Sequence, residues 1–122
     1  MARILVVEDS PTDQHQLVNL LQKAGHEVIT ANSGEEALKM AGFEKPDLIL
    51  MDVVMPGMNG FQATRQLTRA PDTRHIPVVI VSTKNQDTDK VWGERQGARA
   101  YITKPVVEKT LISTVDQILS AA

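Results

Sequence analysis

Short apolar runs recur along the chain, and polar residues bound each of them. Three runs, Arg3–Val7, Leu48–Met51 and Val78–Val81, are almost wholly aliphatic. Runs this short that are apolar on both faces are typical of strands inside a parallel sheet. The weaker runs Glu27–Ala31 and Ala100–Thr103 predict two more strands.

Apolar residues recur at helical spacing between and after these runs. The capping box formed by Ser33 and Glu36 is one sign of a helix start, and Gly25 and Gly97 are stop signals. We predict helices from Pro11 to Gly25, from the Ser33 cap through Met40, over Phe61–Leu67, over Asp87–Gln96, and along the stripe Leu111–Leu119.

Strands and helices therefore alternate along the whole chain. Alternation of this kind predicts a parallel sheet with helices on both faces, and right-handed crossovers leave few topologies. We predict an α/β fold, a flavodoxin-like doubly wound (βα)5 three-layer sandwich with strand order 2-1-3-4-5. We expect it to form a single domain over residues 1–122.

Composition and charge narrow the classes of function. The chain is 42% hydrophobic and 23% charged, which is ordinary for a soluble globular protein. A net charge of −2 with scattered Lys and Arg predicts no nucleic-acid surface, and the lack of Cys excludes disulfides and thiolate metal sites. The apolar runs are far shorter than the about 20 residues of a membrane span. We expect a cytoplasmic protein without a membrane partner.

Polar residues follow the predicted strands at their carboxyl ends. Glu8 and Asp9 follow the first strand, Asp52 the third, Ser82 the fourth and Lys104 the fifth. In a doubly wound sheet these residues meet at one edge, and the ends of strands 1 and 3 form the ligand-binding switch point. Three carboxylates and one lysine give a formal charge of −2, which a divalent cation offsets. Oxygen ligands without His or Cys indicate Mg²⁺.

The same residues suit phosphoryl transfer. Asp52 is the central carboxylate and the candidate nucleophile, because a carboxylate attacks phosphorus to form an acyl phosphate. Asp9 and Asp52 are candidate metal ligands, with a backbone carbonyl just after Asp52, and Glu8 acts through a water. Lys104 neutralises charge on the phosphoryl oxygens and Ser82 donates a hydrogen bond to one of them. Each residue alone has an ordinary explanation as a helix cap, a turn or a surface residue, so the hypothesis depends on the set.

Four stretches, "ILVVEDS", "PDLILMDVVMPGMNG", "IPVVIVST" and "GARAYITKP", resemble the CheY-like receiver domain of bacterial response regulators in two-component systems. The resemblance covers essentially the whole chain. It implies that Asp52 accepts a phosphoryl group from a phosphohistidine on a histidine kinase. It also implies Mg²⁺ bound by Asp9, Asp52 and the Val54 carbonyl, with Glu8 in the acidic pocket and Lys104 pairing with the phosphate.

The resemblance further implies a switch. Ser82 is the switch hydroxyl, Tyr101 is the aromatic switch residue, and the Lys104–Pro105 peptide is cis. The implied output face, where a protein effector binds, consists of the helix over Asp87–Gln96, the strand Ala100–Thr103 and the helix along Leu111–Leu119. Tyr101 belongs to this face, and we expect Trp92 to lie close to it. The same face supports dimers in some relatives, so a monomer or a weak dimer is expected.

A second resemblance concerns a narrower group within the response regulators. The stretches "MPGMNGFQATRQLT", "TKNQDTDKVWGERQGA" and "YITKPV" also resemble stand-alone PilH-type regulators, which implies a role in type IV pilus twitching motility or chemotaxis-like signalling. Such a protein is not an enzyme beyond its own phosphorylation and dephosphorylation.

Two other interpretations of the function stay open. One alternative is a phosphate sink without a dedicated effector. The other, a Mg²⁺-dependent phosphatase with an aspartyl nucleophile, is disfavoured because Val54 occupies the position of its usual second acid.

Several positions carry narrower expectations. We expect Asp52 to lie at the exit of its strand, open to solvent rather than buried. Val54 and Lys84 flank the predicted phosphoryl group, and we expect them to affect its lifetime. The histidines lack metal-ligand spacing and are interpreted as surface residues: His15, His26 and His75.

Overall fold

Five parallel strands and five helices alternate in the computed structural model, which describes residues 1–121. The strands form one sheet in the order β2-β1-β3-β4-β5, which confirms the predicted doubly wound topology. The elements are β1 (Arg3–Val7), α1 (Pro11–Lys23), β2 (Glu27–Ala31), α2 (Gly34–Glu44), β3 (Leu48–Met51), α3 (Gly60–Arg69), β4 (Val78–Ser82), α4 (Asp87–Arg95), β5 (Ala100–Thr103) and α5 (Glu108–Ser120).

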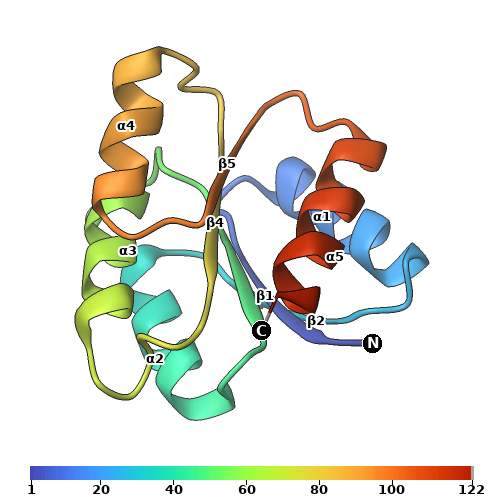
Figure 1. Ribbon diagram of the computed structural model, residues 1–122, viewed down its shortest axis with the longest axis horizontal. Helices are drawn as coiled ribbons and strands as arrows, with labels where there is room; N and C mark the ends of the chain where they lie inside the picture. The colour runs from blue at the N-terminus through green and yellow to red at the C-terminus, as the bar shows by residue number, and fades with distance from the viewer. Residues whose placement is uncertain (122) are drawn as a thin grey trace.

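The sheet separates two layers of helices. Helices α1 and α5 cover one face, and α2, α3 and α4 cover the other (Figure 1). Neighbouring strand residues contribute to opposite cores: Ile4 packs with α1 and α5, whereas Leu5 packs with α2 and α3. Strands β1, β3 and β4 are therefore apolar at every position but the first of β1 and the last of β4, as a sheet covered on both faces requires.

The predicted strands match the observed ones closely, and the helix ends differ more. Helix α2 continues past the predicted end at Met40 to Glu44, where Lys45 adopts a left-handed backbone with φ 46° and ends the helix. Strand β4 extends by one residue to include Ser82. Across residues 1–121, every helix is too short or too polar to cross a membrane.

One histidine is not on the surface. His26 has a side chain only 7% exposed, and its Nδ1 accepts a hydrogen bond of 3.2 Å from the Ala2 backbone N–H. The predicted surface position of His26 is therefore wrong. The tertiary contact between the β2 start and the N-terminus buries the ring, and no local sequence pattern marks that contact. His15 and His75 are exposed, as predicted.

Helix α3 begins directly against the end of β3. A Cβ atom at Gly60 would lie 1.9 Å from the Asp52 carbonyl oxygen, so only glycine fits there. The Gly60 N–H donates to the Val53 carbonyl at 2.9 Å, and Asn59 and Gln62 close a capping box at the helix start. The chain that follows β3 is therefore held on both sides, which fixes the position of Asp52.

Candidate functional site: an acidic cluster with a buried lysine

The polar residues at the strand ends converge at one edge of the sheet, at the top of Figure 1. Val7 pairs with Met51 in the sheet, so the residues that follow, Glu8 and Asp52, lie side by side. Carboxylate oxygens of Glu8, Asp9 and Asp52 all lie within 4.8 Å of one another. The predicted convergence of the three acids is confirmed.

Lys104 enters this cluster from the end of β5. Its ammonium lies 2.6 Å from Glu8 Oε1 and 3.6 Å from Asp52 Oδ1, and the side chain is only 12% exposed. Burial lowers the pKa of Lys104, but hydrogen bonds to Glu8 and Asp13 and the charge of Asp52 outweigh it and raise that pKa. The lysine therefore stays positively charged. The Lys104–Pro105 peptide is cis, as predicted.

A further carboxylate, Asp13, also contacts the lysine, and no sequence pattern marks this contact. Asp13 Oδ2 accepts a hydrogen bond of 2.9 Å from Lys104 Nζ, across 91 residues of chain. Asp13 stands in the first turn of α1, where its N–H donates to the capping hydroxyl of Ser10, and an acid at that position looks like an ordinary helix-start residue. Four carboxylates, Glu8, Asp9, Asp13 and Asp52, and one lysine give a formal charge of −3 rather than −2.

Asp52 is more buried than the sequence suggested. Its side chain is 8% exposed, so the expectation of a solvent-open carboxylate is wrong, because the carboxylate lies beside the buried Glu8 and the largely buried Lys104. Burial, together with the negative charge of Glu8, raises the pKa of Asp52 to about 6, although the Lys104 charge and the Val53 N–H act to lower it. The groups around Asp52 therefore do not fully offset the negative charge of its ionised form.

This raised pKa predicts a pH-dependent stability difference between wild type and Asp52→Asn. The unfolded carboxyl titrates near 3.8 and the folded one near 6, so the Asp52 contribution to stability is present at low pH and is lost as pH rises through this window. Without divalent cations, wild type is expected to lose about 1–2 kcal/mol relative to Asp52→Asn between pH 4 and 7. Urea unfolding at several pH values measures the difference, and parallel stability curves contradict it.

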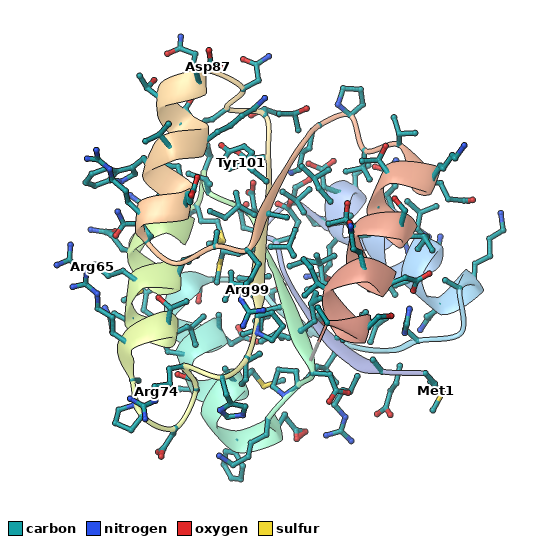
Figure 2. The ribbon with its side chains drawn as sticks, viewed as in Figure 1. Met1, Arg65, Arg74, Asp87, Arg99 and Tyr101 are labelled. Carbon is teal, nitrogen blue, oxygen red and sulfur yellow. The ribbon has the colours of Figure 1, made fainter. Side chains whose placement is uncertain are left out.

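Ser82 and Tyr101 both contact the loop between β4 and α4. The buried Ser82 hydroxyl accepts the Lys84 N–H at 3.1 Å, and the Tyr101 hydroxyl donates to the Lys84 carbonyl at 2.6 Å. Tyr101 lies on the sheet side of α4 (Figure 2). Burial raises the pKa of Tyr101; the Ser82 hydroxyl opposes this shift, and the charge of Asp89 adds to it. The two predicted switch residues are therefore joined through one loop.

Two other predicted residues lie in the loops that follow β3 and β4. The Lys84 ammonium is 3.8 Å from Asp89 Oδ1, and Val54 is 60% exposed beside the site. Trp92 is 48% exposed and lines a groove with Phe61 and Arg65 of α3. It therefore lies on the side of α4 that faces α3, and its place on the output face stays a prediction. Tyr101 instead lines a groove of about 370 Å³ with residues on the other side of α4, Lys90 and Glu94 among them.

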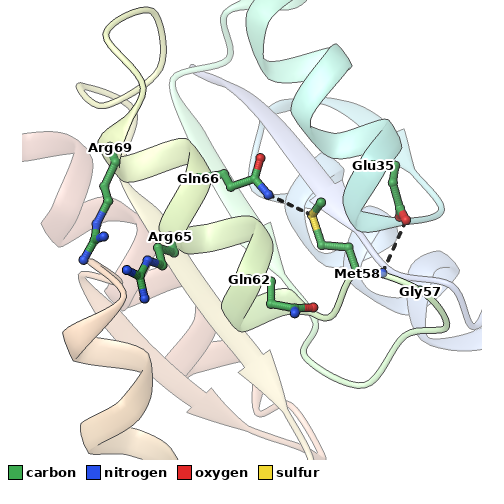
Figure 3. A pocket seen from close by; sticks show the side chains of 7 residues that line it. All are labelled: Glu35, Gly57, Met58, Gln62, Arg65, Gln66 and Arg69. Atoms are coloured by element: carbon green, nitrogen blue, oxygen red, sulfur yellow. Dashed lines mark hydrogen bonds between the residues drawn. The ribbon is translucent and has the colours of Figure 1, made fainter.

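Helix α2 supports the loop that follows Asp52. The Glu35 carboxylate accepts the Met58 N–H at 3.3 Å, and Gly57 turns the chain there with φ 75° (Figure 3). The groove beside this contact has a volume of about 790 Å³ and is lined by residues of α2, α3 and the loop, none of which belongs to the acidic cluster. The contact of Glu35 thus holds the loop that carries Val54.

The donor set has a clear chemical preference. It offers carboxylate oxygens from Glu8, Asp9 and Asp52 without histidine or cysteine, and Asp9 is exposed while the other two are buried. Hard divalent cations such as Mg²⁺ favour oxygen ligands and keep part of their water shell, which an exposed ligand permits. The residues present therefore fit such a cation.

Comparison with known proteins identifies the family. The pattern of the response regulator receiver domain matches residues 4–116. The chain belongs to the response regulator receiver family. This receiver domain is 58% identical over 120 residues to protein PilH of Pseudomonas aeruginosa, and the match covers 98% of this chain and 99% of PilH.

Solved structures agree with this assignment. The chemotaxis protein CheY4 of Vibrio cholerae superposes with a TM-score of 0.89 at 33% identity, covering 96% of this chain and 98% of that chain. The receiver domain of a sensor histidine kinase from Pseudomonas aeruginosa superposes with a TM-score of 0.90 at 26% identity, covering 98% of each chain. That structure holds a magnesium ion coordinated in its active site cleft. Receiver domains bind Mg²⁺ at an acidic pocket, and this receiver domain has such a pocket.

Proposed function

We propose that this receiver domain accepts a phosphoryl group on Asp52 from a phosphohistidine of a histidine kinase. The observation that carries the proposal is a buried carboxylate at the end of β3, 3.6 Å from a charged lysine and next to two further acids. An Asp52 oxygen attacks phosphorus and forms the P–O bond of an acyl phosphate. The P–N bond to the kinase histidine breaks, and its electron pair stays on the imidazole nitrogen.

Asp9, Asp52 and the backbone carbonyl of Val54 are proposed to hold Mg²⁺, with Glu8 acting through a water. The cation supplies positive charge that stabilises the phosphoryl oxygens. Lys104 supplies a second positive charge from the carboxyl end of β5, at the same edge of the sheet, and its pKa keeps it protonated at neutral pH. Burial of Asp52 and Glu8 limits the access of bulk water to the reacting carboxylate.

Magnesium is therefore expected to stabilise the protein through Asp52. At pH 7.5, Mg²⁺ at ten times its dissociation constant is expected to raise the unfolding free energy by about 1.4 kcal/mol. Asp52→Asn removes a charged ligand and is expected to lose most of this gain. Thermal denaturation with and without Mg²⁺ measures it, and Asp116→Asn, whose side chain is 62% exposed, is the control. An equal Mg²⁺ effect in wild type and Asp52→Asn contradicts the assignment.

The phosphoryl group is proposed to change a binding face through Ser82 and Tyr101. The Ser82 hydroxyl accepts a hydrogen bond from the Lys84 N–H in the loop between β4 and α4. The Tyr101 hydroxyl donates a hydrogen bond to the Lys84 carbonyl in the same loop. If Ser82 turns to donate to a phosphoryl oxygen, it gives up its contact with the Lys84 N–H. The loop then changes which conformation Tyr101 prefers. This change shifts the conformational equilibrium of the face formed by α4, β5 and α5, where a protein effector binds.

Incubation with Mg²⁺ and acetyl phosphate tests the phosphoryl-accepting function. Intact mass spectrometry is expected to show the gain of one phosphoryl group, and EDTA is expected to prevent it. The protein is proposed to catalyse only this self-phosphorylation and its own dephosphorylation. Wild-type protein that gains no phosphoryl group under these conditions rules the proposal out.

The similarity to PilH supports a place in type IV pilus twitching motility or a chemotaxis-like pathway. The receiver domain is proposed to act there as a response regulator with a phosphorylation-dependent effector. A pull-down from the native cell that compares wild type with Asp52→Ala tests the effector role. A partner retained by wild type and lost by the variant supports it, whereas rapid loss of phosphate without any such partner supports a phosphate sink.

A further inference from the structure

Asp13 has no part in the phosphoryl transfer described above, yet it contacts the lysine at the centre of the site. The Lys104 ammonium lies 2.6 Å from Glu8 and 2.9 Å from Asp13, both closer than the 3.6 Å to Asp52. An ammonium has three N–H donors. Two of the three N–H groups are thus directed to Glu8 and Asp13, and neither of these two N–H groups points to Asp52, the predicted phosphoryl acceptor.

The contact is more than a helix-start interaction. An acid in the first turn stabilises a helix through the dipole, and that effect needs no cationic partner. Asp13 instead turns its carboxylate to Lys104, although Glu8 already provides this lysine with a buried carboxylate. The Asp13 side chain is 40% exposed, so an opening of the pair exposes Asp13 to water at little cost.

We propose that Asp13 is a positioning residue that holds Lys104 toward α1 and thereby lowers the fraction of protein phosphorylated on Asp52. The proposal rests on the function proposed above. Before Lys104 donates to a phosphoryl oxygen, it must weaken its bond to Asp13. Asp13 also adds a negative charge near the incoming phosphoryl group. Both effects favour the unphosphorylated state.

The test compares Asp13→Asn with wild type at fixed acetyl phosphate and Mg²⁺. Loss of one nearby charge and of its ion pair is expected to raise the ratio of phosphorylated to unphosphorylated protein roughly three- to tenfold. Asp13→Glu keeps the charge and is the matched control, expected to stay close to wild type. An unchanged ratio in Asp13→Asn overturns the proposal.

A double-variant cycle separates an effect through Lys104 from a direct one. In Lys104→Ala protein, Asp13→Asn is expected to change the ratio by a clearly smaller factor than in wild type. The same factor in both backgrounds overturns the positioning role, because Asp13 then acts without the lysine.

A second readout needs neither Mg²⁺ nor phosphate. In EDTA, the losses in Tm of the single variants Asp13→Asn and Lys104→Ala are expected to sum to more than the loss in the double variant, by about 2–6 °C. Additive losses show that the pair does not form and overturn the proposal. This cycle is independent of the proposed function, so unphosphorylated wild-type protein and an absent Asp13–Lys104 pair are distinguishable failures.

Discussion

Asp52→Asn is expected to abolish phosphorylation of the receiver domain. The amide keeps the shape of the side chain but is a far weaker nucleophile than a carboxylate, so uptake from acetyl phosphate is expected to fall by at least about 100-fold. Intact mass spectrometry over time measures the rate. The variant is expected to fold at least as well as wild type, because it removes a buried carboxylate whose pKa is raised to about 6.

Two controls make this result specific. Asp116→Asn removes an exposed carboxylate on α5, outside the acidic cluster, and is expected to be phosphorylated at the wild-type rate. A thermal melt of Asp52→Asn shows whether the variant is folded. If folded Asp52→Asn takes up phosphate as fast as wild type, another residue is the acceptor and the proposed function fails.

Gly60→Ala is expected to destabilise the fold more than any surface substitution. The added Cβ would lie 1.9 Å from the Asp52 carbonyl oxygen and 2.8 Å from the Val53 Cα, and both are backbone atoms. The chain therefore has to move at the point where β3 ends. We expect a loss of about 3 kcal/mol or more, with a fall in Tm of about 10 °C.

Gly42→Ala is the matched control for this substitution. Gly42 lies within α2, and a Cβ atom there meets nothing within 4 Å. Replacement by Ala is expected to stabilise the helix by about 0.5–1 kcal/mol because Ala has the higher helix propensity. Thermal unfolding of the two variants measures the contrast. Equal melting temperatures for Gly60→Ala and wild type would mean that the close packing of α3 on β3 does not constrain Asp52.

The strands and the site residues at their ends were predictable because both follow from short-range pattern. A buried parallel strand is a continuous apolar run, so the first polar residue after it marks the carboxyl end of the strand. Glu8, Asp52 and Lys104 are found by this rule, and the doubly wound order then brings them together.

Other features depend on contacts that no local pattern encodes. Asp13 meets Lys104 across 91 residues, and its place in the first turn of α1 has a sufficient local explanation. The burial of Asp52 depends on Glu8 and Lys104, which lie far from it along the chain. The orientation of Trp92 depends on which side of the short, mostly polar helix α4 packs on the sheet.

Chemical mapping of the phosphorylated residue tests the central claim most directly. Borohydride reduces an aspartyl phosphate to homoserine, so wild type is treated with acetyl phosphate and Mg²⁺, reduced, digested and sequenced by mass spectrometry. We expect homoserine at position 52 alone, and none when EDTA replaces Mg²⁺. Homoserine at Asp9 or Asp13, or phosphate retained on a histidine or serine, would contradict the assignment of Asp52 as the phosphoryl acceptor.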